Sequence, residues 1–138
     1  MPIIQRIKQL NLPLGEYVVI GSGLLDALGL RTAGDIDIAV TPKLFASLQS
    51  TGEWKEAEQY NKAFLLKDGV EISSQLEWGD FPTTVTEAIN SSIVVDGVPF
   101  LNMEELKKFK RALGRQKDYD DIALLDAYLL SNPANATI

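Results

Sequence analysis

Two aspartates separated by a single residue lie within an apolar segment, where residues 35–40 read DIDIAV. The alternation of acid and isoleucine is the period of a β-strand with one polar face. Side chains two residues apart on a strand point the same way, with Cβ atoms ~6.5–7 Å apart, so Asp35 and Asp37 are expected to share a face. Two such carboxylates can bind one divalent cation or bracket two cations ~3.5–4 Å apart. The spacing therefore predicts a metal site on a rigid strand.

A glycine turn precedes these acids, because Gly21, Ser22 and Gly23 follow an apolar strand expected at residues 16–20 and open a helical segment. Glycine lets the backbone approach a phosphate closely, and the free N–H groups of a first helical turn attract anions. The serine hydroxyl adds a hydrogen-bond donor. A dinucleotide fingerprint is excluded because Asp26 occupies its third glycine position, and no Walker A motif is present. The turn is a candidate phosphate site of another kind.

A third carboxylate would complete a two-metal site, and the segment 63–75 offers one. This segment is expected to form a β-hairpin because Asp-Gly lies between two apolar runs. Glu71 on its second strand is the main candidate, and Glu77 is a more distant one. Ser73 and Gln75 share the face of Glu71 and are interpreted as ordinary polar-face residues.

The composition limits which metals could bind. The chain of 138 residues contains no cysteine and no histidine. Thiolate and imidazole ligands are therefore excluded, and any bound cation must be held by oxygens, which favours magnesium, manganese or calcium over zinc.

The charge and hydropathy of the chain limit its partners and location. Thirteen basic and nineteen acidic residues give a net charge of −6. A bare duplex nucleic-acid binder would usually be basic, so broad binding to phosphate backbones is not expected. No apolar run approaches ~20 residues, so no membrane partner is expected. The N-terminus lacks the layout of a signal peptide, and we expect a cytoplasmic protein.

The remaining segments alternate between helical and strand-like patterns, which indicates an α/β (α+β) class. The expected helices cover residues 3–10, a segment capped by Thr41, residues 82–90, 102–113 and 117–130, and a short strand is expected around Trp54 and a second hairpin at residues 93–100. We expect one domain over residues 1–131, with a core at 1–100 and a C-terminal helical pair at 102–131. Residues 132–138 are expected to be a flexible tail.

The order of strand, Gly-Ser turn, helix and Asp-x-Asp over residues 18–40 resembles the nucleotidyltransferase superfamily of the DNA polymerase β type, especially its small single-domain bacterial members. The resemblance extends more loosely through the hairpin at 63–76 and the C-terminal run at 110–125. It implies a mixed β-sheet with helices packed on it. It also implies a nucleoside triphosphate bound through magnesium, or manganese, at Asp35 and Asp37.

The resemblance also implies an activity and roles for individual residues. The enzyme would transfer a nucleoside monophosphate from an NTP, with ATP as the expected donor, to an acceptor, and would release pyrophosphate. Asp35, Asp37 and Glu71 are the expected metal-binding and catalytic residues. The resemblance implies that Gly21 and Ser22 hold the β- and γ-phosphates. Arg115 and Lys117 are placed to reach the polyphosphate.

The acceptor stays open between a small molecule, an RNA and a protein. The chain lacks the separate substrate-binding domain of the aminoglycoside-modifying and polymerase relatives. Because the acceptor site looks incomplete in one chain, a homo-oligomer is an open possibility.

Other interpretations stand beside the enzymatic one. In some family members the third acid stands one strand repeat later, at the place of Ser73. That register would remove the third acid and leave a catalytically degenerate domain that binds a nucleotide or a protein. A further alternative is the enzyme half of a toxin–antitoxin or defence pair. Asp35 and Asp37 could also be the solvated face of an ordinary strand.

Several other residues are given structural interpretations. Asp118 and Asp121 are expected in the first turn of the last helix, where the helix dipole favours acids. The basic stripe of Lys107, Arg111 and Arg115 is expected to be a solvated helix face. The aromatic residues Trp54, Tyr60, Phe64 and Trp78 are expected to lie in the core.

Overall fold

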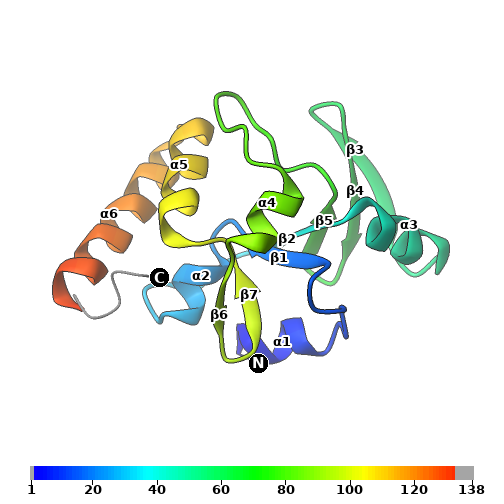
Figure 1. The fold of residues 1–138 in the computed structure, drawn as a ribbon, viewed down its shortest axis with the longest axis horizontal. Helices are drawn as coiled ribbons and strands as arrows, with labels where there is room; N and C mark the ends of the chain where they lie inside the picture. Colours follow the sequence, from blue (N-terminus) through cyan, green and yellow to red (C-terminus); the bar gives the residue numbers. More distant parts are fainter. Residues whose placement is uncertain (1, 133–138) are drawn as a thin grey trace.

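A single mixed β-sheet forms the centre of the molecule, with the strand order β3-β4-β5-β2-β1-β7-β6 (Figure 1). The computed structural model describes residues 2–132. The elements in chain order are α1 (Ile3–Lys8), β1 (Tyr17–Ile20), α2 (Gly23–Ala27), β2 (Ile36–Val40), α3 (Pro42–Ser50), β3 (Lys55–Gln59), β4 (Lys62–Lys67), β5 (Val70–Ser73), α4 (Val85–Asn90), β6 (Ile93–Val95), β7 (Val98–Phe100), α5 (Met103–Leu113) and α6 (Gln116–Ser131). The tail expected at 132–138 lies outside the described residues apart from Asn132. The α+β class and the mixed sheet expected from the resemblance are confirmed.

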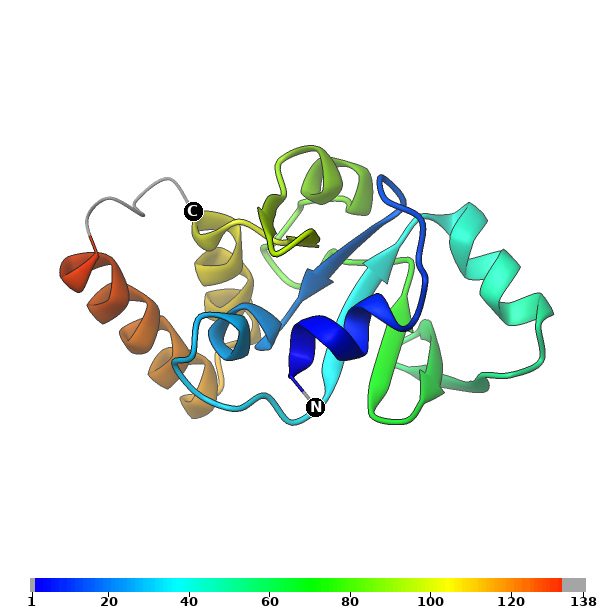
Figure 2. The ribbon, with the colours of Figure 1, turned by 90° about the horizontal axis from the view of Figure 1, so that it is seen from below.

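The two strands at the centre of the sheet are mostly buried because helices cover both sides, and Asp37 is the one charged residue within them. Strands β1 and β2 pair antiparallel, whereas β2 pairs parallel with β5 and β1 pairs parallel with β7. Helix α1 lies on one side of these strands and α4 on the other (Figures 1 and 2). Val18 of β1 and Ile36 and Ile38 of β2 are almost fully buried. This burial holds β2, the strand that carries Asp37, in the centre of the sheet.

The helix starts follow the capping residues of the sequence. The Thr41 hydroxyl accepts the N–H of Leu44 at 3.2 Å, and Pro42 occupies the first turn of α3 as expected. The Asn102 side chain accepts the N–H of Glu105 at 2.9 Å and caps α5. No capping box forms there, because the Glu105 carboxylate accepts the Thr83 hydroxyl instead of returning to the cap.

The region 54–62 differs from its expected structure. The strand expected around Trp54 begins one residue later as β3 and pairs antiparallel with β4. The two strands are joined by Tyr60 and Asn61, which both have left-handed backbones, with φ of 54° and 61°. A tight hairpin turn of this kind usually takes Asn-Gly or Asp-Gly, so a tyrosine gave no turn signal.

The C-terminal helical pair packs at one end of the sheet, at the opposite end of the molecule from α3 (Figures 1 and 2). Gly114, with a left-handed φ of 68°, ends α5 and turns the chain into α6. The expected apolar stripe of α5 is present, because Leu106 and Phe109 are buried and Leu113 packs against the core. No helix within residues 2–132 is long and apolar enough to span a membrane.

Gly23 makes the closest packing contact between α2 and β1. A Cβ atom at this position would lie 2.6 Å from Cγ1 of Val19 and 3.6 Å from side-chain atoms of Ile3 and Phe100. No side chain fits there without movement of the buried strand, so the glycine sets how closely the turn at residues 21–22 approaches the sheet.

We therefore expect Gly23→Ala to lower the free energy of unfolding by about 1–3 kcal/mol, because added atoms in a packed core force backbone shifts. The matched control is Gly34→Ala, whose Cβ would meet no atom within 4 Å. Urea unfolding of both variants measures the difference. Equal destabilisation of the two variants would show that the contact with Val19 is unimportant.

Candidate active site

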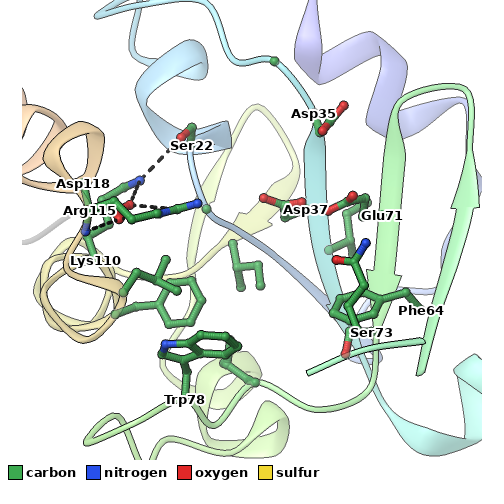
Figure 3. A pocket seen from close by; sticks show the side chains of 18 of the residues that line it. Ser22, Asp35, Asp37, Phe64, Glu71, Ser73, Trp78, Lys110, Arg115 and Asp118 are labelled. Atoms are coloured by element: carbon green, nitrogen blue, oxygen red, sulfur yellow. Dashed lines mark hydrogen bonds and ion pairs between the residues drawn. The ribbon is translucent and has the colours of Figure 1, made fainter. Parts of the chain in front are cut away.

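A cleft of about 510 Å³ lies between the centre of the sheet and the C-terminal helical pair (Figure 3). The residues expected from the sequence to form a site come from four separate segments of the chain. All of them line this cleft, namely Gly21, Ser22, Asp35, Asp37, Glu71, Arg115 and Lys117. The fold thus brings the predicted residues together in one open space.

Asp37 and Glu71 are direct neighbours on adjacent strands. The parallel pairing of β2 and β5 places Asp37 opposite Glu71 and Ala39 opposite Ser73. Figure 3 shows the Asp37 and Glu71 carboxylates side by side. Ser73 is buried, and its hydroxyl bonds to the backbone of Gln75 at 3.1 Å. Glu71, and not Ser73, is therefore the residue of β5 that lies next to Asp37.

The environment of Asp37 disfavours a bare negative charge. Burial, the hydrogen bond with Glu71 and the charges of Glu71 and Asp35 raise the pKa of Asp37 to about 7. Two carboxylates forced together share a proton unless a cation neutralises them. A cation bound beside these two carboxylates would relieve their repulsion.

Asp35 lies next to this pair but does not complete it in the observed rotamer. It immediately precedes β2 and is exposed, and its carboxylate is directed away from Asp37 and Glu71 in Figure 3. Within residues 2–132 no three acidic side chains already converge as a complete metal site. Because the Asp35 side chain is exposed, a change of rotamer could bring it toward the pair at small cost. The donor set consists of carboxylate oxygens, which suits magnesium or manganese.

The turn after β1 approaches Asp37 closely because residue 21 is glycine. Gly21 has a left-handed φ of 68°, and a Cβ on it would lie 2.6 Å from Oδ2 of Asp37. Ser22 follows as the N-cap of α2, yet its side chain makes no capping bond. Helix α2 has five residues, so its dipole is a weak anion attractor. The serine hydroxyl is instead engaged by cationic side chains.

A buried charge cluster holds that hydroxyl. Asp121 on α6 accepts Nε of Arg31 at 2.6 Å and Nζ of Lys110 at 2.8 Å. Nη2 of Arg31 also donates to Oγ of Ser22 at 2.6 Å. Burial would raise the pKa of Asp121, but the bonds from Arg31 and Lys110 outweigh it and hold the pKa at about 2. The cluster joins the C-terminal helices to the glycine turn.

Asp118 organises a second cation at the rim of the cleft. Its carboxylate, 1% exposed, accepts Nε of Arg115 at 2.7 Å and the Arg115 backbone N–H at 3.0 Å. Burial would raise the pKa of Asp118, but the bonds from Arg115 outweigh it and lower the pKa. The charge of Asp37 in the cleft also contributes to the raised pKa of Arg115. Lys117 lines the same rim.

The helix-dipole interpretation of Asp121 is therefore wrong, and Lys110 and Arg31 were missed. A signal for Lys110 exists in the sequence, because it lies four residues after Leu106 and within the apolar stripe of α5. In the same way, Asp121 lies four residues before Leu125 on the inward face of α6. A charge inside an apolar stripe indicates a buried ion pair. No comparable local signal identifies Arg31.

The aromatic residues divide between the core and the cleft. Trp54 is buried as expected. The expectation is wrong for Tyr60, whose exposed fraction is 71%. Phe64 and Trp78 are half-buried and line the cleft.

Lys107, from the basic stripe of α5, is mostly covered. Only 12% of its side chain is exposed, and its ammonium group lies beside Asp126.

The comparisons with known proteins concern the fold. No protein-family model and no curated protein sequence matches the chain. The crystal structure of ANT(2″)-Ia, an aminoglycoside nucleotidyltransferase, in complex with adenylyl-2″-tobramycin is similar to this chain with a TM-score of 0.57. The two chains are 16% identical, and the alignment covers 99% of this chain and 90% of that one. The chain therefore has a nucleotidyltransferase-like fold.

The raised pKa of Asp37 predicts a pH-dependent effect of Asp37→Asn on stability in metal-free buffer. Unfolding lowers the pKa from about 7 to near the ordinary 3.8. Between these values the folded state keeps a proton that the unfolded state releases, so the wild type loses stability as pH rises through this window. The asparagine variant lacks this loss.

We expect Asp37→Asn to become more stable relative to the wild type as pH rises from about 4 to about 7, with no further change above that. Urea unfolding at several pH values measures the difference, and Asp120→Asn on the exposed face of α6 is the control. A difference between wild type and Asp37→Asn that stays constant with pH would contradict the assigned titration.

The buried charge cluster predicts a large effect of Lys110→Met. This change removes one of the two cations that neutralise Asp121, and breaking a buried ion pair costs about 3–5 kcal/mol. The control is Lys108→Met, whose side chain is 58% exposed beside Glu105. An exposed pair contributes under about 1 kcal/mol. Thermal unfolding of both variants tests this, and similar melting temperatures would exclude a structural role for Lys110.

Proposed function

We propose that this protein is a divalent-metal-dependent nucleotidyltransferase. It transfers a nucleoside monophosphate from an NTP, with ATP as the expected donor, to a hydroxyl group of an acceptor. The observation that carries the proposal is the charge arrangement of the cleft. A group of carboxylates, Asp37 and Glu71 with Asp35 beside them, lies opposite a fixed cationic group around Ser22.

The cationic side of the cleft suits a polyphosphate. Arg31 has 33% of its side chain exposed and is held in place by Asp121. The Ser22 hydroxyl accepts Nη2 of Arg31, and Arg115 reaches the rim from the start of α6. These groups would bind the β- and γ-phosphates and stabilise the charge that develops on the departing pyrophosphate.

The carboxylate side suits a hard cation. Asp37 and Glu71, with Asp35 after a change of rotamer, would hold magnesium or manganese. When bound, the cation neutralises the phosphates and polarises the α-phosphate. The raised pKa of Asp37 supports this assignment, since a carboxyl group whose pKa lies this far above its ordinary value lacks a countercharge.

The reaction is a displacement at phosphorus. The acceptor oxygen forms a bond to the α-phosphorus, the bond from the α-phosphorus to the α,β-bridging oxygen breaks, and pyrophosphate leaves toward Ser22 and Arg31. The acceptor hydroxyl proton goes to the Glu71 carboxylate or through it to water. Most of the rate enhancement comes from positioning and from preorganised charge.

The acceptor is open between a small molecule, an RNA and a protein. ANT(2″)-Ia holds an adenylylated tobramycin, and the alignment spans 90% of that chain. A chain of this size can therefore enclose an acceptor site without a large further domain, which favours a small hydroxyl-bearing acceptor. A second copy of the chain could add residues to that site.

A second candidate function is nucleotide binding without turnover. The orientation of Asp35 favours it, because its carboxylate is turned away from Asp37 and Glu71. Calorimetry with ATP and magnesium, together with a pyrophosphate-release assay, separates the two functions. If ATP binds but no tested hydroxyl acceptor leads to pyrophosphate release, the non-catalytic function is favoured.

The catalytic proposal predicts graded effects of three variants on labelling of an acceptor pool by α-labelled ATP. The double variant Asp35→Asn with Asp37→Asn should abolish labelling, because no carboxylate pair remains for the cation. Glu71→Gln should lower the rate at least about 100-fold, as expected for loss of a general base. Ser73→Ala should retain the wild-type rate. Labelling by the double variant, or greater damage from Ser73→Ala than from Glu71→Gln, would contradict the assignment.

A further inference from the structure

One wall of the cleft is aromatic and apolar, and the proposed chemistry does not use it. Trp78, Phe109, Leu76 and Leu113 line this wall, and Tyr60 stands at its edge. The rings of Tyr60 and Trp78 meet edge to face, with centroids 4.7 Å apart. We refer to these five residues as the aromatic wall.

Leu76 and Phe109 belong to the buried core, whereas Tyr60 is exposed and Trp78 is half-buried, and exposed aromatic surface costs stability unless something covers it. Tyr60 is 71% exposed although it lies in a tight turn with a left-handed backbone, a conformation unfavourable for a bulky residue. Trp78 is oriented by Lys62, whose Nζ lies 5.3 Å from the ring centroid and donates to the Glu77 carbonyl. These contacts hold the half-buried Trp78 ring in one orientation beside the cleft, with Lys62 and Tyr60 against it.

The geometry of the displacement indicates which part of the substrate meets this wall. The attacking and leaving oxygens lie roughly in line across the transferred phosphorus. If pyrophosphate leaves toward Ser22, the acceptor must approach from the opposite side, where Glu71 and Phe64 lie. Figure 3 shows Ser22 and Glu71 on opposite sides of Asp37, with Trp78 below the line that joins them. The nucleoside must leave the α-phosphate in that third direction.

We infer that the aromatic wall is the binding site for the nucleobase of the triphosphate, with Trp78 as its stacking surface and Tyr60 as its outer edge. This inference rests on the proposed function. Stacking on an aromatic ring tolerates different bases because every base has a flat π-face. The site therefore accepts all nucleoside triphosphates and binds purines more tightly than pyrimidines, through their larger stacked area.

The two tryptophans of the chain provide an internal test. Trp78 lines the cleft, whereas Trp54 is 9% exposed, packs beneath Lys67 at 4.8 Å and does not line the cleft. A Trp54→Phe variant reports on Trp78 alone by fluorescence. A Trp78→Leu variant reports on Trp54 alone and removes the stacking surface.

The experiment compares ATP with inorganic tripolyphosphate, each with magnesium, by fluorescence and by calorimetry. In Trp54→Phe we expect ATP to quench the emission of Trp78 and tripolyphosphate to bind without quenching. Trp78→Leu should weaken ATP binding about tenfold or more and leave tripolyphosphate binding unchanged. Tyr60→Ala, at a position that is 71% exposed, should weaken ATP binding in the same selective way.

The outcomes separate this inference from the proposed function. If the wild type binds ATP but Trp78→Leu and Tyr60→Ala bind it equally well, the nucleobase lies elsewhere and nucleotidyl transfer still stands. If both variants weaken ATP and tripolyphosphate to the same extent, the wall has a general structural role and the inference is wrong. If the wild type binds neither ligand, the proposed function and this inference both fail.

Discussion

The bidentate contact of Asp121 with Arg31 and Lys110 is the interaction on which the site depends. It joins α6, α5 and the segment between α2 and β2, and through Arg31 it reaches the hydroxyl of Ser22. Lys110 is 2% exposed, so the contact is a buried ionic network rather than a surface bridge. Such networks cost desolvation free energy. Here the network places fixed positive charge beside a group of carboxylates, which neither sheet nor helices would do alone.

On the opposite side of the cleft, the carboxylates of Asp37 and Glu71 repel each other. Asp37 and Glu71 are brought together by strand register, which leaves their side chains little freedom to separate. The cations across the cleft are largely committed to Asp121 and Asp118, so they relieve the repulsion between Asp37 and Glu71 only in part. The cleft therefore has fixed positive charge on one side and crowded carboxylates on the other.

The sequence predicts the parts of this arrangement that depend on neighbours along the chain. The alternation at 35–40, the Asp-Gly turns and the caps at Thr41 and Asn102 are local, and the corresponding elements form. The pairing of Arg31 with Asp121 spans ninety positions, and no periodicity encodes it. The sequence predicts Tyr60 in the core because aromatic residues are usually buried. Aromatic residues also line clefts, however, and a sequence pattern does not separate the two cases. The rotamer of Asp35 depends on local solvent exposure, which a strand pattern does not describe.

The distribution of the site along the chain has a consequence for biosynthesis. The acidic residues and the glycine turn belong to the first part to leave the ribosome, whereas Asp121 emerges among the last described residues. Domains fold as units during translation, with N-terminal segments available first. A nascent chain that has formed the sheet but not yet docked its final helix holds Arg31 and Ser22 without their partner. Such an intermediate has an unfinished cleft, because Arg31 is fixed beside Ser22 only after Asp121 has joined them.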